Sequence, residues 1–260
     1  MKVRDVIGLI EAAAPPRTQE DWDNSGLQTG SPDAEVTGVL LSLDATPAVV
    51  NEALAKGCNL LITHHPLLFG KIRSLSDSDE TGACVREALL GGLSVYSSHT
   101  PLDRMRGGVS WRMASMLGLT GIRALEAGAD ALGYGAIGQW ERPRPLSEAL
   151  AAAREAFGVN NLRYRAPDDV RPVRTVALCG GAGAFLIKEA RRQGADLYLT
   201  GDLKYHDWRA GGARLALADI GHFESEQCTK QIFFDLLSEK IPNFAIHFSE
   251  QDTNPIQIFT

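Results

Sequence analysis

The stretch Leu60-Leu61-Ile62-Thr63-His64-His65-Pro66 decides the fold of this 260-residue chain. A strand that is apolar on both faces is typical of the centre of an α/β sheet, whereas half-buried strands alternate apolar and polar residues. Proline cannot continue a strand, so we expect this one to end at about His65. Its two imidazoles then lie where open α/β sheets place their binding sites, at the carboxyl end of a buried strand.

The segments around this strand predict further strands and helices in alternation. The periodicity of apolar residues and the position of Gly and Pro indicate where each element begins and ends. Residues 21–30 are rich in turn residues and are not expected to form a regular element. Strands are expected at 36–43, 93–97, 126–140 and 215–220, and helices at 3–14, 47–56, 80–90, 104–122 (with a turn) and 146–157.

The second half of the chain repeats part of the first. With a shift of 137 residues, 36–63 aligns without a gap on 173–200, and nine of the 28 positions are identical. Both copies predict strand, loop, helix, glycine and strand, and the glycine falls where a helix C-cap is expected. Shared composition of two α/β units could explain some identities, but the absence of gaps favours an internal duplication.

We therefore predict an α/β fold with two similar α/β domains from an internal duplication. The domain boundary is expected near 122–126, which gives domains at 1–122 and 123–260. The C-terminal strand is free to pack back on the first domain.

Composition indicates the class of protein. An apolar content of 44% and a charged content of 22% are ordinary for a soluble globular protein. The net charge of −6 makes nucleic acid an unlikely partner. The four cysteines form no CxxC pair and are interpreted as small buried residues in a reducing cytosol. No signal peptide and no apolar run of about 20 residues is evident, so we expect a cytoplasmic protein without a membrane partner.

Five of the six histidines fall at predicted strand ends or just beyond them. The exception, His247, is predicted to be structural. Because the ends of parallel strands lie along one edge of a sheet, the duplicated architecture is expected to bring these side chains together. The four strand ends carry His64-His65, His99 with Asp103, Asp202 with His206, and His222 with Glu226.

Imidazole and carboxylate together suit Zn²⁺, Mn²⁺, Fe²⁺ or Co²⁺ rather than Ca²⁺. Adjacent strand residues point to opposite faces, so His64 and His65 share one metal only if the strand has already frayed. They fit more naturally as ligands to two metals, or as one ligand and one supporting residue. His222 and Glu226 share a helix face and can chelate one ion or bridge two. Structural alternatives remain open, including Asp103 as a helix cap.

The turn Gly180-Gly181-Ala182-Gly183 follows a predicted strand and precedes a helix. Such a turn could hold a phosphate at a helix N-terminus. A tight strand-to-helix connection explains the glycines equally well.

Taken together, the motifs resemble those of the Nif-three-like family, whose members are also called GTP cyclohydrolase I type 2 homologues. They run in order over nearly the whole chain, which corresponds to the short form without the family's inserted domain. The motifs are Trp22-Asp23-Asn24-Ser25-Gly26-Leu27-Gln28, Thr63-His64-His65-Pro66-Leu67, Ser98-His99-Thr100-Pro101-Leu102-Asp103, Ala177-Leu178-Cys179-Gly180-Gly181-Ala182-Gly183, Thr200-Gly201-Asp202-Leu203-Lys204-Tyr205-His206-Asp207 and Gly221-His222-Phe223-Glu224-Ser225-Glu226.

The resemblance implies two divalent metal ions per subunit, bound in the cleft between the two domains. It also implies a homohexameric ring built as a trimer of dimers. His99 and His206 match motif positions near the metals, and we assign them either to the support of the metal ligands or to catalytic proton transfer. The implied metal ligands are His64, His65, Asp103, His222 and Glu226.

Two functions are compatible with this site. In the first, two metal ions about 3.5–4 Å apart bridge a water and hold it as hydroxide for hydrolysis. The small-molecule substrate suggested by the family is a purine nucleotide such as GTP, opened at its C8 carbon. In the second, the protein is a non-enzymatic metal-handling or ring-shaped scaffold protein. Open coordination positions on the metals would favour catalysis.

Overall fold

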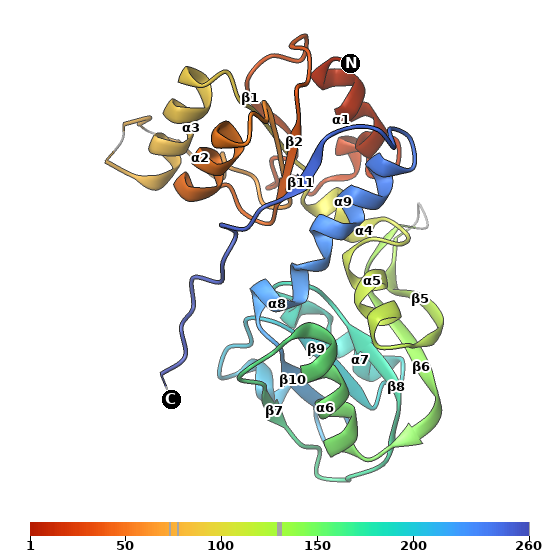
Figure 1. Ribbon diagram of the computed structural model, residues 1–260. Coiled ribbons are helices and arrows are strands. Elements are labelled where there is room, and N and C mark those ends of the chain that lie inside the picture. Colours follow the sequence, from red (N-terminus) through yellow and green to blue (C-terminus); the bar gives the residue numbers. More distant parts are fainter. Residues whose placement is uncertain (73, 77, 129–131, 260) are drawn as a thin grey trace. The chain divides into compact units, whose positions relative to one another are not determined.

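The computed structural model describes residues 1–72, 74–76, 78–128 and 132–259, and contacts divide the chain into two compact units (Figure 1). The first unit comprises Met1–Leu102 and Thr229–Pro255, and the second comprises Asp103–Cys228 and Ile256–Thr260. The predicted boundary at 122/123 falls within a strand of the second unit, Thr120–Ala127. Each unit is a mixed α/β structure with its own sheet, in agreement with the predicted class.

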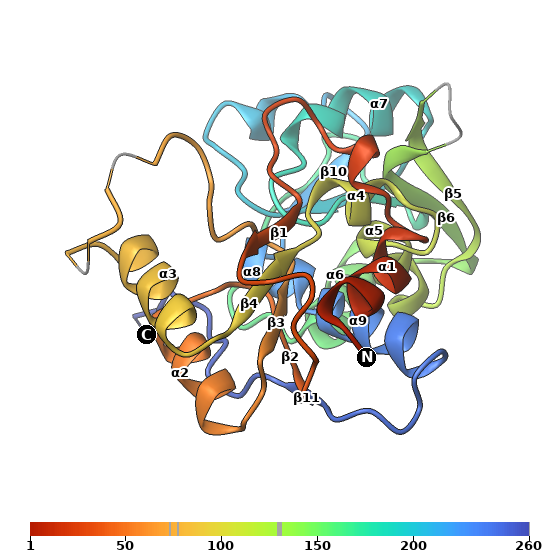
Figure 2. The same cartoon turned by 90° about the horizontal axis from the view of Figure 1, so that it is seen from above.

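The first unit has a five-stranded sheet in the order β1-β4-β3-β2-β11. β2, β3, β4 and β11 are parallel, and β1 runs antiparallel to β4. Figures 1 and 2 show α2 and α3 on one face of this sheet and α1 and α9 on the other. The elements are α1 (Val3–Glu11), η1 (Pro16–Thr18), β1 (Gly26–Thr29), β2 (Val39–Ser42), α2 (Pro47–Ala55), β3 (Leu60–Thr63), α3 (Glu80–Leu90), β4 (Ser94–Ser97), α9 (Cys228–Ser238) and β11 (Ile246–Phe248), with α4 (Thr100–Arg104) at the division.

The second unit has a six-stranded sheet in the order β5-β6-β8-β9-β10-β7. β8, β9 and β10 are parallel, and the remaining pairs are antiparallel. α6 and α7 cover opposite faces (Figures 1 and 2). The elements are α5 (Val109–Met116), β5 (Thr120–Ala127), β6 (Gly133–Arg144), α6 (Leu146–Phe157), β7 (Arg163–Arg165), β8 (Val173–Leu178), η2 (Ala184–Leu186), α7 (Ile187–Arg192), β9 (Leu197–Thr200), η3 (Asp207–Arg209), β10 (Ala216–Asp219) and α8 (His222–Glu226).

The register of the two central strands supports the internal duplication. Leu61 of β3 pairs with Leu40 of β2, and Tyr198 of β9 pairs with Ala177 of β8. Each residue of the second pair lies 137 positions after its counterpart in the first, so the repeat aligns in space as well as in sequence. The aligned glycines Gly57 and Gly194 also share a left-handed backbone, with φ of 71° and 73°, where a side chain would be strained.

The central strands are buried on both faces, as the apolar runs predict. All four residues of β3 and all four of β9 are buried. Leu61 packs with Val49 and Val50 of α2, and Tyr198 packs with Ile187 and Ala190 of α7. At about 25 cal/mol per Å² of apolar surface removed from water, such packing provides the main force that fixes the strand ends in place.

Three strand predictions need correction. Residues 21–30 include a strand, β1, because Gly26 and Leu27 pair with the edge of β4 although the segment lacks an apolar alternation. One strand was expected over 126–140, but the structure has a hairpin of β5 and β6; residues 129–131 lie outside the described residues. The strand that begins at Leu60 was expected to end at about His65. It ends at Thr63, so neither His64 nor His65 belongs to β3.

The C-terminal strand β11 pairs in parallel with β2, so the last strand does join the first sheet. Its residue His247 is exposed and pairs with Leu40 through the backbone. Across the described ranges, no helix is both long enough and apolar enough to cross a membrane.

Candidate functional site

His64 and His65 lie in the turn that follows β3. Both backbone N–H groups donate to the carbonyl oxygen of Leu43, at 3.2 and 3.0 Å. Sharing one acceptor turns the chain out of the strand, and the two rings then lie side by side with centroids 5.0 Å apart. The strict alternation of a strand therefore does not apply, and the two imidazoles are close to each other rather than on opposite faces.

The hydrogen bonds of these two rings define which nitrogen carries the proton. Nδ1 of His64 lies 2.9 Å from the carbonyl oxygen of Ser98, and Nδ1 of His65 lies 2.7 Å from Oδ1 of Asp44. A carbonyl and a carboxylate only accept hydrogen bonds, so each Nδ1 donates. The lone pair of each neutral ring is then on Nε2, the arrangement that metal-binding histidines usually have.

His99 follows β4 and has the same kind of partner. Its Nδ1 lies 2.8 Å from Oδ1 of Asp23, whose side chain is fully buried. The backbone N–H of Thr100 donates to Oδ2 of the same carboxylate at 3.0 Å. Burial alone would raise the pKa of Asp23, but the hydrogen bonds from His99 and Thr100 outweigh it and hold the pKa well below its usual range.

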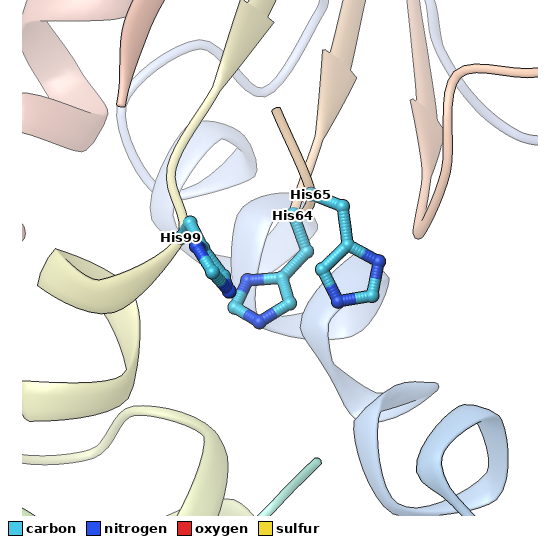
Figure 3. Close-up of side chains that lie close together, drawn as sticks. All are labelled: His64, His65 and His99. Carbon is cyan, nitrogen blue, oxygen red and sulfur yellow. The ribbon is translucent and has the colours of Figure 1, made fainter. Parts of the chain in front are cut away.

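The three histidines of the first unit form a cluster that could hold a metal ion (Figure 3). One nitrogen from each of His64, His65 and His99 lies within 4.8 Å of the others. The ring centroid of His99 is 5.2 Å from that of His64 and 5.5 Å from that of His65. Neutral imidazoles with their protons directed away from the cluster fit a transition-metal ion such as Zn²⁺.

In the second unit, His222 and Glu226 occupy the first and last positions of α8. Nε2 of His222 lies 3.0 Å from Oε2 of Glu226, which confirms that the pair shares a helix face. Nδ1 of His222 lies 2.8 Å from Oδ2 of Asp202. Asp202 has φ of 54°, the only positive value at a non-glycine position among the described residues. Nδ1 of His222 thus lies beside the carboxylate of Asp202, and its Nε2 lies beside that of Glu226.

The turn of Gly180 and Gly181 makes room for this pair. A Cβ on Gly181 would clash with Oε1 of Glu226 and would lie 3.2 Å from Nε2 of His222. The N–H of Gly181 donates to Oγ of Ser225, and that of Gly183 donates to Oγ1 of Thr200, each at 2.9 Å. Because these amides already have partners inside the fold, the structure favours a tight connection over a phosphate site.

Asp103, in α4, shares the electrostatic environment of Glu226. Cys179 and Cys228 are both buried enough that desolvation raises their thiol pKa, that of Cys228 to about 12. The carboxylates of Asp103 and Glu226 each add to both increases. Two carboxylates that act on the same two thiols concentrate negative charge in this part of the second unit, which favours a cation.

His206 does not join these groups. It is exposed and its ring lies 5.2 Å from that of Tyr205. None of the clusters that could hold a metal among the described residues includes it. The structure therefore gives no geometric support for a proton-transfer role of His206, whereas His99 lies beside His64 and His65.

Three carboxylates orient the histidines, namely Asp23, Asp44 and Asp202. Asp202 was expected at a strand end with His206, but none of the three was predicted to orient a histidine. Asp202 had a detectable signal, because it aligns with His65 in the repeat. Asp23 and Asp44 lie in turn-forming segments. Asp23 belongs to a family motif, but nothing in the sequence around either residue indicated that it would contact a histidine.

A pocket of about 400 Å³ opens beside His65 in the first unit. Its walls include the orienting carboxylate of Asp44, the ring of Phe69 and the side chain of Glu80. Phe69 is 55% exposed, which is unusual for so large an apolar side chain. The volume lies within the range of about 300–1,000 Å³ that is common for small-molecule sites.

Comparison with known proteins places the chain among relatives of matching length. The sequence model of Duf34/NIF3 (NGG1p interacting factor 3) matches residues 1–255. A GTP cyclohydrolase 1 type 2 homolog from Clostridium acetobutylicum is 33% identical over 232 residues, which is 87% of this chain and 85% of that relative. Another from Lactococcus lactis is 33% identical over 264 residues, or 98% of each chain.

Solved structures of related proteins have a similar fold over the whole chain. The Staphylococcus aureus protein SA1388 has a TM-score of 0.91 at 27% identity, over 100% of this chain and 99% of that one. A Bacillus cereus protein related to NIF3 has a TM-score of 0.92 at 23% identity, with the same coverage, and shows that the fold is shared. The resemblance predicted from the motifs is confirmed, and the chain belongs to the Duf34/NIF3 family.

Proposed function

We propose that this protein binds two divalent transition-metal ions per subunit and uses them to hydrolyse a small nucleotide-like substrate. The carrying observation is the orientation of His64 and His65, in which a carbonyl and a carboxylate fix each proton on Nδ1 and place each lone pair on Nε2, the atom that usually binds a metal. Zn²⁺, Mn²⁺, Fe²⁺ and Co²⁺ suit these donors. The proposed ligands are His64, His65, Asp103, His222 and Glu226.

Bound divalent ions would supply Lewis acidity that lowers the pKa of a water molecule. His99 then has the properties of a general base. Its Nδ1–H donates to the buried carboxylate of Asp23, so the lone pair on Nε2 is the proposed proton acceptor. His99 is a better candidate for this role than the exposed His206.

The pocket beside His65 is the proposed binding place of the reacting ring. Phe69 offers an exposed aromatic surface for stacking. Asp44 and Glu80 can accept hydrogen bonds from ring N–H groups, whereas their charge would oppose a phosphate at this point. The curated relatives carry the name GTP cyclohydrolase 1 type 2 homolog, which supports a purine nucleotide as the first substrate to test.

The decisive experiment combines metal analysis with turnover. Purified wild-type protein should contain close to two transition-metal ions per chain and hydrolyse GTP with opening of the purine ring at C8. A His65→Ala/Glu226→Ala double variant should lose the metals and the activity. His247→Ala, which changes an exposed histidine of β11, is the matched control and should keep both. Unchanged metal content in the double variant would overturn the ligand assignment.

Metal binding without turnover of nucleotides, phosphoesters or cyclic amides would favour the metal-handling alternative. We also propose the ring-shaped hexamer, a trimer of dimers, as the assembled form on the basis of the family resemblance. Light scattering in solution should then give six times the mass of the 28.1 kDa chain.

A further inference from the structure

A second pocket, of about 470 Å³, lies in the second unit beside the β5–β6 hairpin. Its walls carry the guanidinium groups of Arg104, Arg106 and Arg123 together with the half-buried indole of Trp111. The other described residues that line it are small ones, Ala124, Ala127 and Gly133, and none of the described lining residues is acidic. A concave surface with one sign of charge concentrates ions of the opposite sign.

Aromatic rings hold two of the arginines in place. The guanidinium carbon of Arg106 lies 5.5 Å from the ring centroid of Trp111, and that of Arg104 lies 5.7 Å from the centroid of Tyr134. The Arg106 guanidinium lies over an aromatic face, an arrangement in which the N–H groups at the edge of a guanidinium can also contact a ligand. These contacts reduce the conformational entropy that each side chain would lose when a ligand binds.

Arg123 is held in place by a hydrogen bond to a neutral side chain. One of its N–H groups donates to Oε1 of Gln193, a neutral acceptor. The carboxylate of Glu189, whose pKa is lowered to about 2, is held mainly by Arg192 through two hydrogen bonds and only partly by the charge of Arg123. Glu189 is therefore already engaged and does not neutralise the pocket.

Three surface arginines could also form an ordinary charged surface that contacts only water. Such a face needs neither a concavity nor an indole within it. The volume exceeds the lower limit of about 300 Å³ for small-molecule pockets, so there is room for more than a single inorganic ion. Arginine forks match the paired oxygens of phosphate groups, and indole matches the flat organic part of a phosphorylated ligand.

We propose that this pocket binds the diphosphate group of a phosphorylated small molecule, with Arg106 and Arg123 on its oxygens and Trp111 beside its organic part. None of these residues is a proposed metal ligand, so the proposal does not depend on the metal centre or on hydrolysis.

The test is calorimetric titration of the full-length protein with inorganic diphosphate and with ADP. It is run after treatment with a chelator, so that phosphate oxygens cannot bind metal ions, and repeated on the metal-loaded protein. We expect saturable binding that weakens as salt is raised from 50 to 200 mM, because charged contacts are screened. Arg106→Gln and Arg123→Gln should each weaken the binding of diphosphate at least tenfold.

Arg142→Gln is the matched control, since Arg142 is an exposed residue of β6 that does not line the pocket and the variant has the same net charge. It should bind diphosphate as the wild type does. Trp111→Phe should weaken ADP more than diphosphate, which separates a nucleotide site from a site for the free anion. Circular dichroism should show that each variant is folded.

Two results would overturn the proposal. One is the absence of saturable binding of either ligand to the wild-type protein. The other is an equal loss of affinity in Arg106→Gln and Arg142→Gln, which would reveal a general effect of net charge. Metal content should be the same in Arg106→Gln and wild type, so failure here leaves the proposed metal centre untouched.

Discussion

Asp202 aligns with His65 in the internal repeat, and its Oδ2 lies 2.8 Å from Nδ1 of His222. The first repeat has a histidine at this position, and the second has a carboxylate that orients a histidine from another element. The duplication has therefore given one position two different roles, a proposed ligand in one copy and the support of a proposed ligand in the other.

Replacing Asp202 by Ala should loosen His222 and weaken metal binding. Loss of a group that orients a metal-binding histidine typically lowers metal affinity by about 10–100-fold. Competition with a chelating dye would measure the affinity. Asp168→Ala is the control, because Asp168 is 74% exposed and contacts only Arg165 among the ion pairs of the described residues. Equal affinities of Asp202→Ala and wild type would contradict the role of Asp202.

Asp23→Asn should reduce turnover while it preserves the metals. The amide NH₂ of asparagine can donate to Nδ1 of His99, which would move the ring proton to Nε2 and remove the proposed base. A correctly placed acid–base group contributes about 10²–10⁴-fold to rate, and a loss of that order is expected in kcat. Metal content falling in parallel with kcat would instead indicate that His99 is a ligand.

The same substitution should alter how stability depends on pH. The pKa of Asp23 is lower in the folded protein than the value of about 3.9 for an unfolded chain. The ionised carboxylate therefore stabilises the fold fully above that value, and the contribution shrinks as the pH falls below it. In urea denaturation, the stability difference between wild type and Asp23→Asn should be constant from pH 7 to about 5 and narrow towards pH 3. A difference that widens in acid would be inconsistent with the lowered pKa.

Gly181→Ala should displace Glu226 and His222. The added methyl group would clash with the Glu226 carboxylate, and φ of 60° strains any residue with a Cβ. Gly158→Ala separates the two effects, because Gly158 has φ of 65° but open space around its Cβ position. Both variants should lose about 1–2 kcal/mol of stability, whereas only Gly181→Ala should lose metal. Equal metal content in the two variants would show that the contact with Glu226 is unimportant.

Asp252→Ala should destabilise the first unit. The Asp252 side chain is 1% exposed, and its Oδ2 accepts hydrogen bonds from Nζ of Lys230 and from the N–H of Leu43, at 2.8 and 2.9 Å. Removing one partner of a buried ion pair costs about 3–5 kcal/mol. Glu250→Ala, at a 78% exposed partner of Lys56, should cost less than about 1 kcal/mol. Thermal unfolding of both variants provides the comparison, and similar midpoints would contradict this assignment.

The sequence was most informative where local patterns decide the structure. The helix predicted at 146–157 has those bounds, because its periodicity and its C-terminal Gly158 are local signals. The apolar runs likewise located the buried strands that end at Thr63 and Thr200.

Structure determined by distant partners escaped prediction. β1 is a strand because it forms backbone hydrogen bonds with the edge of β4. The sequence of β1 alone does not indicate that this partner exists. The same holds for Asp23 and Asp44. Each lies in a turn, and the local sequence does not indicate that its carboxylate will contact a histidine 76 residues later, for Asp23, or 21 residues later, for Asp44. The fold class and the histidines were therefore predictable, whereas the groups that orient those histidines were not.

The position of β11 has a consequence for how the chain is made. β11 covers the outer edge of β2, yet residues 103–228, which form most of the second unit, lie between the two strands in sequence. During synthesis, β2 therefore emerges long before its partner, and its apolar edge stays open for pairing with another chain. The first unit can begin to fold early, but its sheet is complete only after residue 248 has left the ribosome.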